Sequence, residues 1–268
     1  MPELPEVETV VRSLKPIIGC RIEEARFFAR RIVIGSPQRI AAHAQGAIVR
    51  GLSRMGKHIV LELDSGLLLL IHLGMTGKLL LTDTPGPYTR ARFALSGAAL
   101  SSNSLCYDDI RMFGRIELAD TLPARLRRLG PEPLAISFDE FLKRLHMHRS
   151  QVKPLLLNQS FVRGMGNIYT DEALFRARIH PCAIASRLSC ERARRLHQAM
   201  VEVLTLAIER GGSSISDYVD ADGRKGWFQL SHQVYQKTGE PCPRCSTPIR
   251  RMLVAQRGTH YCPKCQRR

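Results

Sequence analysis

The sequence predicts an α+β protein with an N-terminal helix and β-sandwich, a helical second half and a four-cysteine zinc finger at the C-terminus. Three observations predict this class. Between about residues 22 and 118, short apolar runs are separated by Gly, Ser and Pro, which is typical of a sandwich rather than of alternating βαβ units. After residue 133 the apolar spacing becomes helical. The last 27 residues contain two C-x2-C pairs.

The first half contains an expected helix followed by strands. The helix is predicted directly after the N-terminus, because apolar residues recur at helical spacing (Val7, Val10, Val11, Leu14 and Ile18). Apolar residues alternate with others over residues 59–63, which predicts a strand. Residues 64–66 are interpreted as a turn, and residues 67–71 as a second, buried strand.

The second half is expected to be helical. Residues 130–133, Gly-Pro-Glu-Pro, are interpreted as a linker, and Ser137 with Glu140 forms a capping box that opens a helix through Leu145. Further helices are predicted over 152–157, 167–178 and 189–210, the last closed by two glycines, with a polar loop over 213–240. The predicted domains are therefore 1–130, 131–240 and 241–268.

Composition restricts the class of protein and of partner. The chain has 268 residues, with 40 Lys and Arg against 24 Asp and Glu, a formal net charge of +16 and a pI near 10.0. This surplus favours a polyanionic partner. The longest apolar run, residues 67–71, is too short to cross a bilayer, and no signal peptide is visible. We expect a soluble, cytoplasmic protein that associates with the nucleoid when engaged, and a monomer, because no heptad pattern appears.

The eight cysteines form two groups. Four lie in two C-x2-C pairs separated by sixteen residues, the spacing of a four-thiolate zinc ribbon (Cys242, Cys245, Cys262 and Cys265). Two disulfides or an iron–sulfur cluster are the alternatives, but no redox motif accompanies the pairs. The other four are interpreted as small buried apolar residues without a function (Cys20, Cys106, Cys182 and Cys190).

Positive charge concentrates in the predicted finger. Residues 241–268 contain no acid and seven basic residues (Arg244, Arg250, Arg251, Arg257, Lys264, Arg267 and Arg268). One zinc ion with four thiolates contributes a charge of −2, so about +5 remains. A solvated basic face is the simpler interpretation. A rigid ribbon with this charge favours a hairpin that contacts phosphates.

The N-terminal sequence Met1-Pro-Glu-Leu-Pro-Glu-Val-Glu offers a nucleophile. Removal of Met1 would leave Pro2 as a secondary amine, and an α-amino group with a pKa of about 8 is partly neutral at cellular pH. Such an amine can attack a sugar carbon and form an iminium, with the adjacent Glu3 as proton donor. The alternative is a proline-rich leader into an acid-capped helix.

Four motifs along the whole chain favour the N-terminal nucleophile over the proline-rich leader. Met1-Pro-Glu-Leu-Pro-Glu-Val-Glu-Thr9, His72-Leu-Gly-Met-Thr-Gly77, Gly164-Met-Gly-Asn-Ile-Tyr169 and the terminal cysteine ribbon occur in the order seen in bacterial formamidopyrimidine-DNA glycosylases, which this sequence resembles. The resemblance implies a bilobal protein with a β-sandwich lobe and a helix–two-turn–helix lobe that carries a zinc finger. It also implies excision of oxidised purines (8-oxoguanine and formamidopyrimidines) from duplex DNA, followed by strand cleavage through β,δ-elimination in base excision repair.

The resemblance assigns catalytic roles residue by residue. Pro2 is similar to the family's Schiff-base nucleophile, and Glu3 would protonate the opening sugar ring. Lys57 occupies the position of a lysine that donates protons during glycosylic cleavage and β-elimination. Arg257 matches the finger arginine associated with δ-elimination. A guanidinium is a poor acid, so we interpret its role as orientation and charge.

The resemblance also implies DNA contacts. Met75, Arg111 and Phe113 would fill the gap left by the extruded base, with Arg111 bonded to the orphaned cytosine. The other expected contacts are Arg90, Arg149, Lys153, which would reach towards the flipped nucleotide, and Asn167, predicted to cap the next helix. Residues 216–225 correspond to a mobile segment that covers the lesion.

Three departures from the family pattern affect the expected lesion preference rather than the reaction. Met112 removes a charge, Arg90 stands where a His is common, and Arg163 replaces a small residue. An endonuclease VIII-like enzyme for oxidised pyrimidines is one alternative. The Pro-Glu-Leu-Pro-Glu opening argues against it. The other is a zinc-ribbon protein that binds DNA without catalysis and would tolerate a blocked N-terminus.

Overall fold

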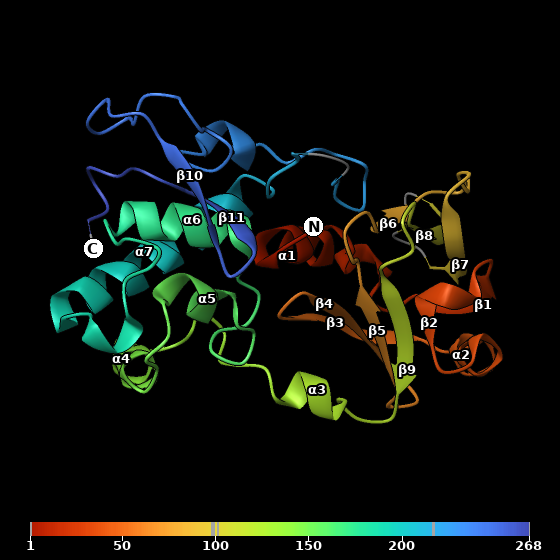
Figure 1. Ribbon diagram of the computed structural model, residues 1–268. Coiled ribbons are helices and arrows are strands. Elements are labelled where there is room, and N and C mark those ends of the chain that lie inside the picture. Colours follow the sequence, from red (N-terminus) through yellow and green to blue (C-terminus); the bar gives the residue numbers. More distant parts are fainter. Residues whose placement is uncertain (1, 98–99, 101, 216–217, 268) are drawn as a thin grey trace. The chain divides into compact units, whose positions relative to one another are not determined.

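The computed structural model describes residues 2–97, 100, 102–215 and 218–267 and divides the chain into two compact units (Figure 1). The first unit contains Met1–Arg127 together with Arg210–Gln229, and the second contains Arg128–Glu209 together with Leu230–Arg268. Residues 210–229, which the sequence analysis assigns to the second domain, thus pack with the first unit. The three-domain division stays a prediction.

Two sheets form the frame of the first unit. The four-stranded antiparallel sheet has the order β1-β7-β8-β6 and contains β1 (Arg21–Phe27), β6 (Lys78–Leu81), β7 (Thr89–Ser96) and β8 (Ser104–Asp108). The five-stranded sheet has the order β2-β9-β5-β4-β3 and contains β2 (Val33–Ile34), β3 (Val49–Met55), β4 (His58–Leu63), β5 (Leu68–His72) and β9 (Arg115–Ala119). Only β2 and β9 pair in parallel among these described strands. The predicted β-sandwich is confirmed.

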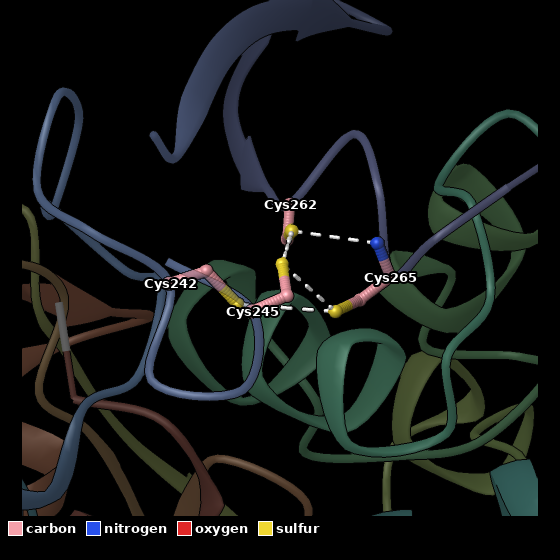
Figure 2. A group of neighbouring side chains, drawn as sticks. All are labelled: Cys242, Cys245, Cys262 and Cys265. Carbon is pink, nitrogen blue, oxygen red and sulfur yellow. Dashed lines mark hydrogen bonds between the residues drawn. The ribbon is translucent and has the colours of Figure 1, made fainter. Parts of the chain in front are cut away.

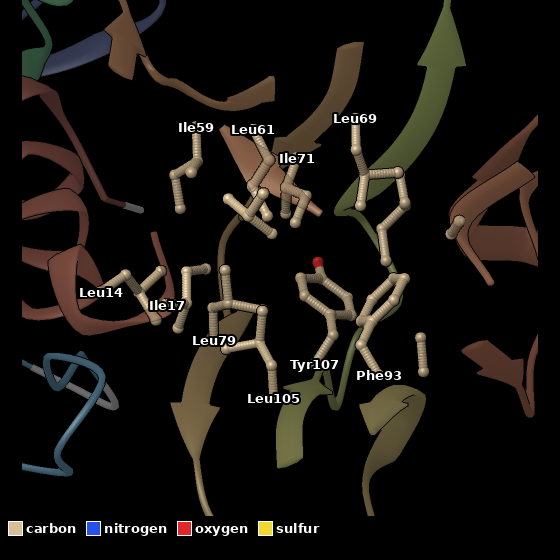
Figure 3. Packing of buried hydrophobic residues seen from close by; sticks show 14 of the residues in the cluster. Leu14, Ile17, Ile59, Leu61, Leu69, Ile71, Leu79, Phe93, Leu105 and Tyr107 are labelled. Carbon is tan, nitrogen blue, oxygen red and sulfur yellow. The ribbon is translucent and has the colours of Figure 1, made fainter. Parts of the chain in front are cut away.

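The core of this unit lies between the two sheets and extends to the buried face of the first helix. Alternate residues of β4 point inward, where Ile59 and Leu61 meet Phe93 and Tyr107 of the other sheet (Figure 3). Leu14, directly after helix α1 (Leu4–Ser13), joins the same cluster (Figure 3). Burial of these apolar side chains is the main contribution to stability, at about 25 cal/mol for each Å² removed from water.

Helix α1 is shorter than predicted. It ends at Ser13, and a 3₁₀ turn, η1 (Lys15–Ile17), continues the chain instead of a helix through Ile18. Pro16 has no backbone N–H to donate to the fourth residue before it, so the α-helical pattern cannot pass this point.

Two short helices interrupt the strand region and were not predicted from the sequence. Helix α2 (Pro37–Ala44) begins after Ser36, whose hydroxyl accepts a hydrogen bond from the backbone N–H of Arg39. Helix α3 (Ala124–Arg127) is a single turn. A further 3₁₀ turn, η2 (Arg30–Ile32), precedes β2. Elements of one or two turns are too short for an apolar period to stand out.

Helices form most of the second unit, as predicted. Helix α4 (Phe138–His146) begins where Ser137 accepts from the backbone N–H of Glu140. It is followed by α5 (Val152–Leu157), α6 (Asn167–Arg176), the 3₁₀ turn η3 (Ala185–Arg187) and α7 (Cys190–Glu209). Gly211 and Gly212 follow α7 with φ of 70° and 80°, which confirms the predicted helix end. The region predicted as loop contains one 3₁₀ turn, η4 (Phe228–Ser231).

The C-terminal segment forms a hairpin. Strands β10 (Arg250–Val254) and β11 (Arg257–Tyr261) pair antiparallel through a two-residue turn. The turn residues Ala255 and Gln256 both have positive φ, 47° and 60°, which is the type I′ conformation that fits the twist of paired strands. Within the described residues, no helix has both the length and the apolar character needed to cross a membrane.

Two histidines share a small hollow on the five-stranded sheet. His58 of β4 and His72 of β5 are cross-strand partners with ring centroids 4.7 Å apart, and both line a hollow of about 160 Å³. Burial, followed by the charge of His72, lowers the pKa of His58 to about 4. Burial, followed by the charges of Lys57 and Arg115, lowers the pKa of His72 to about 4. Both imidazoles are therefore neutral at neutral pH.

This pair makes stability depend on pH in a defined direction. Between pH 6.5, the ordinary value of histidine, and pH 4, the unfolded chain binds protons that the folded chain excludes. We expect the free energy of unfolding to fall as pH falls through this window. Burial, followed by the charge of Lys237, lowers the pKa of His232 to about 4 as well, so His58→Gln should reduce the histidine contribution to that fall by about a third, as measured by urea unfolding at several pH values. His43→Gln, which removes an exposed histidine, is the control. An unchanged pH profile in His58→Gln would contradict the assignment.

Candidate functional site

The N-terminal residues are held at the first turn of α1. Pro2 is buried, and Glu3 is only 3% exposed. The backbone N–H of Glu3 donates to Glu6 Oε2 at 2.8 Å in a reciprocal capping box. Carboxylates are stabilised at a helix N-terminus by the exposed backbone N–H groups and the helix dipole. The capping box therefore fixes the backbone and the carboxylate of Glu3, the residue that follows Pro2.

Glu6, which the sequence analysis did not single out, connects this end to the segment Arg210–Gln229. Its Oε1 accepts from the backbone N–H of Ser213 at 2.7 Å, and its carbonyl accepts from the hydroxyl of Tyr218 at 3.2 Å. A Cβ on Gly212 would lie 2.9 Å from Glu6 Oε1, so this glycine permits the close approach. Burial, followed by the charge of Glu6, raises the pKa of Tyr218, whose hydroxyl stays a donor.

The predicted lesion-covering segment, residues 216–225, is described only in part. Ser216 and Asp217 lie outside the described residues. The backbone N–H of Ala221 donates to Ser13 Oγ, and the carbonyl of Ala221 accepts from Leu81. Gly223, with φ of 79°, forms the turn that follows. The mobility of segment 216–225 stays a prediction.

Lys57 lies in the turn between β3 and β4 and is half-buried. Arg54 on β3 donates to Glu8 of α1 at 2.9 Å, so this hairpin is tied to the first helix. Burial raises the pKa of Glu8, but the bonds from Arg54 and Arg12 outweigh it and hold that pKa below the ordinary value. The ion pair thus fixes the hairpin that presents Lys57.

The three predicted gap-filling residues gather around one buried carboxylate. Met75 and Phe113 are 41% and 42% exposed, and the guanidinium of Arg111 lies 4.7 Å from the centre of the Phe113 ring. Asp109, fully buried, accepts from the hydroxyl of Thr76 at 2.6 Å. It also accepts from the backbone N–H groups of residues 111 and 114, at 3.2 and 2.8 Å. Asp109 therefore shapes loop 110–114, which carries Arg111 and Phe113, and joins it through Thr76 to the turn that carries Met75.

Arg90 belongs to the same part of the first unit. It lies on β7, and its Nε donates to the carbonyl of Asp109 at 3.0 Å. The guanidinium is 5.8 Å from the ring of Tyr88. The half-buried Arg90 thus holds the strand end before the Asp109 loop. A contact of Arg90 with DNA stays a prediction.

In the second unit, Arg257 is exposed directly after the hairpin turn. The next residue, Gly258, has a carbonyl that accepts from Lys153 Nζ at 3.1 Å and from Asn167 Nδ2 at 2.9 Å. Two of the predicted DNA contacts therefore hold the strand that carries Arg257. Arg149 is exposed between α4 and α5, and it belongs neither to the residues around Asp109 nor to those that bond to Gly258.

Asn167 differs from the prediction. Gly166 is the N-cap of α6, in an extended conformation, and Asn167 is the first helical residue. The asparagine side chain donates to the carbonyl of Gly258 instead of capping the helix. Its Oδ1 is buried without a hydrogen-bond partner among the described residues.

Lys153 and Asp171 form a fully buried ion pair, 2.6 Å from Nζ to Oδ1. Asp171 Oδ2 accepts from the backbone N–H of His260 at 2.9 Å, so the pair bonds to β11 at both Gly258 and His260. Asp171 was not predicted as a site residue. Because the ammonium of Lys153 is buried here, its predicted approach to a nucleotide stays a prediction.

Removal of the charge on Asp171 tests this support. Asp171→Asn leaves the lysine uncompensated, and we expect a loss of about 3–5 kcal/mol in the free energy of unfolding, measured by urea titration. The double variant Lys153→Met/Asp171→Asn should recover most of it, because no buried charge remains. A double variant as unstable as the single one would show that charge pairing is not the cause.

The four predicted zinc ligands converge in this unit. Cys242 and Cys245 precede β10, and Cys262 and Cys265 follow β11; all four sulfurs lie within 4.8 Å of one another (Figure 2). The Sγ–Sγ distances are 3.9 Å for Cys242–Cys265, 3.5 Å for Cys245–Cys262 and 3.4 Å for Cys245–Cys265. Tetrahedral zinc with bonds of about 2.3 Å separates its sulfurs by about 3.8 Å, so the residues fit one structural zinc ion.

The cysteine knuckles are joined to the helices. Arg244 donates to the carbonyls of Phe175 and Arg176, at 2.9 and 3.2 Å, and lies 4.5 Å from the centre of the Phe175 ring. Gln266, fully buried, accepts from the backbone N–H of Cys262 and donates to the carbonyl of Ile179. The finger is thus built into the helical unit.

Comparison with known proteins identifies the family. The chain matches the models of the formamidopyrimidine-DNA glycosylase N-terminal domain over residues 1–116, of its H2TH domain over 129–219, and of the zinc finger found in FPG and IleRS over 239–268. A formamidopyrimidine-DNA glycosylase of Solibacter usitatus is 55% identical over the full length of both chains. That of Thermus thermophilus is 44% identical over 99% of this chain and 98% of the relative.

Solved structures of FPG proteins have the same fold as this chain. The MutM (FPG) protein of Thermus thermophilus superposes with a TM-score of 0.89 at 43% identity, covering 99% of this chain and 98% of that one. A Lactococcus lactis FPG mutant in complex with Fapy-dG-containing DNA gives 0.90 at 39%, over the full length of both. A β-sandwich unit and a helical unit with a four-thiolate finger define a two-unit zinc-finger DNA glycosylase. The chain belongs to the formamidopyrimidine-DNA glycosylase family.

Proposed function

We propose that this protein excises oxidised purines, 8-oxoguanine and formamidopyrimidines, from duplex DNA and then cleaves the strand at the abasic site. The observation that carries the proposal is the buried pair of Pro2 and Glu3 at the first turn of α1. Similar proteins have been solved with DNA that contains Fapy-dG, an abasic site or carbocyclic 8-oxo-G. A DNA substrate would place the work of the protein in the bacterial cytoplasm, at the nucleoid.

The reaction would begin at the N-terminal amine. With Met1 removed, the neutral nitrogen of Pro2 attacks C1′ of the damaged nucleotide, the C1′–base bond breaks, and the base leaves with a proton. Glu3 protonates the ring oxygen as the sugar opens, which gives an iminium between Pro2 and C1′. The N-terminus of α1 and the bond to Glu6 keep the two groups in position.

The remaining steps would cleave the strand. Loss of a proton from C2′ expels the 3′-phosphate by β-elimination, with Lys57 as proton carrier, and a second elimination expels the 5′-phosphate. The exposed guanidinium of Arg257 would hold that phosphate, and water releases the sugar fragment from Pro2. The three predicted contacts with the gap, Met75, Arg111 and Phe113, are supported by Asp109, which bonds both to the loop of Arg111 and Phe113 and to Thr76, the neighbour of Met75.

Borohydride trapping tests the proposal. The protein is mixed with a duplex that contains 8-oxoguanine opposite cytosine, reduced with borohydride, and digested for peptide mass mapping. We expect the adduct on Pro2. An adduct on a lysine would overturn the nucleophile. Trapping on a thymine glycol duplex without trapping on 8-oxoguanine would overturn the lesion class.

A further inference from the structure

A second cationic site lies in the helical unit, on the side of the cysteine knuckles. A hollow of about 480 Å³ is lined by five cations and two of the zinc ligands (Arg178, Arg192, Arg244, Lys264, Arg267, Cys245 and Cys265). Arg178 follows α6, Arg192 lies in the first turn of α7, and the others belong to the knuckles and the C-terminal segment. No acidic residue lines the hollow.

The zinc centre and the helices do not account for this charge. A four-thiolate zinc site carries −2, which leaves about three of the five positive charges without compensation. Arg244 is occupied by the last carbonyls of α6. No acid pairs with Arg178, Arg192, Lys264 or Arg267 within the described part of the chain. Their neighbours Arg176 and Arg195 do pair, with Glu202 and Glu191.

The position of Arg192 is also unfavourable for its own helix. A cation in the first turn opposes the helix dipole, so helix stability does not explain it. Arg192 is shared with a second hollow of about 430 Å³, which Arg187 also lines. The positive surface therefore extends beyond the space of a single small anion.

This surface is separate from the predicted catalytic end of the unit. Asn167, which holds the strand of Arg257, is the first residue of α6, whereas Arg178 lies just past its last residue. Ten helical residues span about 15 Å. On a single duplex this distance is about four base-pair steps, so Arg178 would hold a phosphate other than the one at Arg257.

We propose that this cationic hollow binds the backbone phosphates of a second DNA duplex segment, in addition to the segment that carries the lesion. Arginine forks match phosphate oxygens in pairs, and three of the residues without an acidic partner are arginines. The hollow has no aromatic residue and no large aliphatic residue that could anchor a protein partner. Such a site would hold the protein on undamaged DNA between lesions.

The first test is the salt dependence of binding to undamaged duplex. In Arg178→Gln/Arg192→Gln, the slope of the logarithm of the binding constant against the logarithm of salt concentration should become shallower by about two, because each lost phosphate contact contributes about 0.9. Arg128→Gln/Lys143→Gln removes two exposed charges elsewhere in the same unit and should leave the slope unchanged. Equal slopes in the wild type and the Arg178/Arg192 variant would overturn the proposal.

The second test separates this site from the reaction. A short lesion duplex on beads is saturated with zinc-loaded protein, and a labelled undamaged duplex is then added. The wild type should capture the second duplex and the Arg178/Arg192 variant should not, while both excise 8-oxoguanine from a short duplex at the same rate. Reduced excision in the variant would place these arginines in the lesion site and overturn the proposal. Capture of a labelled oligo-aspartate peptide in place of the duplex would also overturn it.

Discussion

A variant with one residue inserted between Met1 and Pro2, which stays in place after Met1 is removed, is expected to lose borohydride trapping and strand cleavage completely. The extra residue turns the Pro2 nitrogen into an amide, whose lone pair is delocalised and cannot attack C1′. Binding of lesion DNA should stay within a few-fold of wild type, because no phosphate contact is removed. Trapping gels and a binding titration on the same duplex measure the two effects separately.

Glu3→Gln provides the matched variant for this prediction. It keeps the Pro2 amine and the size of the side chain but removes the acid, so we expect excision to slow by about 10²–10⁴-fold. Glu23→Gln changes an exposed carboxylate of β1 in the same unit and should keep activity near wild type. Full trapping activity in the extended chain, with its extra residue retained in the mass spectrum, would rule out Pro2 as the nucleophile.

Cys245→Ser is expected to release zinc and unfold the β10–β11 hairpin. Metal binding and folding are coupled in such fingers, since the thiolate ligands are brought together only in the folded state. Loss of the ordered hairpin removes Arg257 from its supports, Lys153 and Asn167. Each lost charge-assisted hydrogen bond costs about 1.5–3 kcal/mol, so affinity for lesion DNA should fall about tenfold or more.

The measurements are zinc content by a colorimetric chelator and DNA affinity by titration. Cys190 was predicted to be buried, but it is exposed because it lies in the first turn of α7, outside the cluster. Cys190→Ser is therefore the control and should retain both. Unaltered affinity in a zinc-free Cys245→Ser protein would contradict the role of the finger.

Local signals were predicted well from the sequence. Ser137 caps α4 as expected, because a cap and its partner lie three residues apart and can be seen in any short window. The cysteine pairs are equally local, and their spacing alone indicated one metal site. The end of α1 was predicted too late because the apolar period continued past Pro16 and outweighed the missing N–H in the analysis.

The supports of the site depend on contacts between residues far apart in the sequence. Ser213 bonds to Glu6 across 207 positions, and Gly258 bonds to Lys153 across 105. No spacing rule relates such residues, so Glu6 and Asp171 could not be singled out. Asn167 shows the same limit: its residue type suits a helix cap, but a distant carbonyl competes for its side chain and Gly166 takes the cap.

The discontinuity of the first unit has a consequence for biosynthesis. Tyr218 and Ala221 belong to the core of the sandwich, although most of that core is made from the first 127 residues. The ribosome must therefore complete α4 to α7 before it supplies the last pieces of the first unit. Until then the nascent sandwich exposes the apolar surface that these two side chains will cover, and exposed apolar surface of this kind favours association. Glu6, one of the first residues to be translated, is therefore among the last to gain its partners, Ser213 and Tyr218.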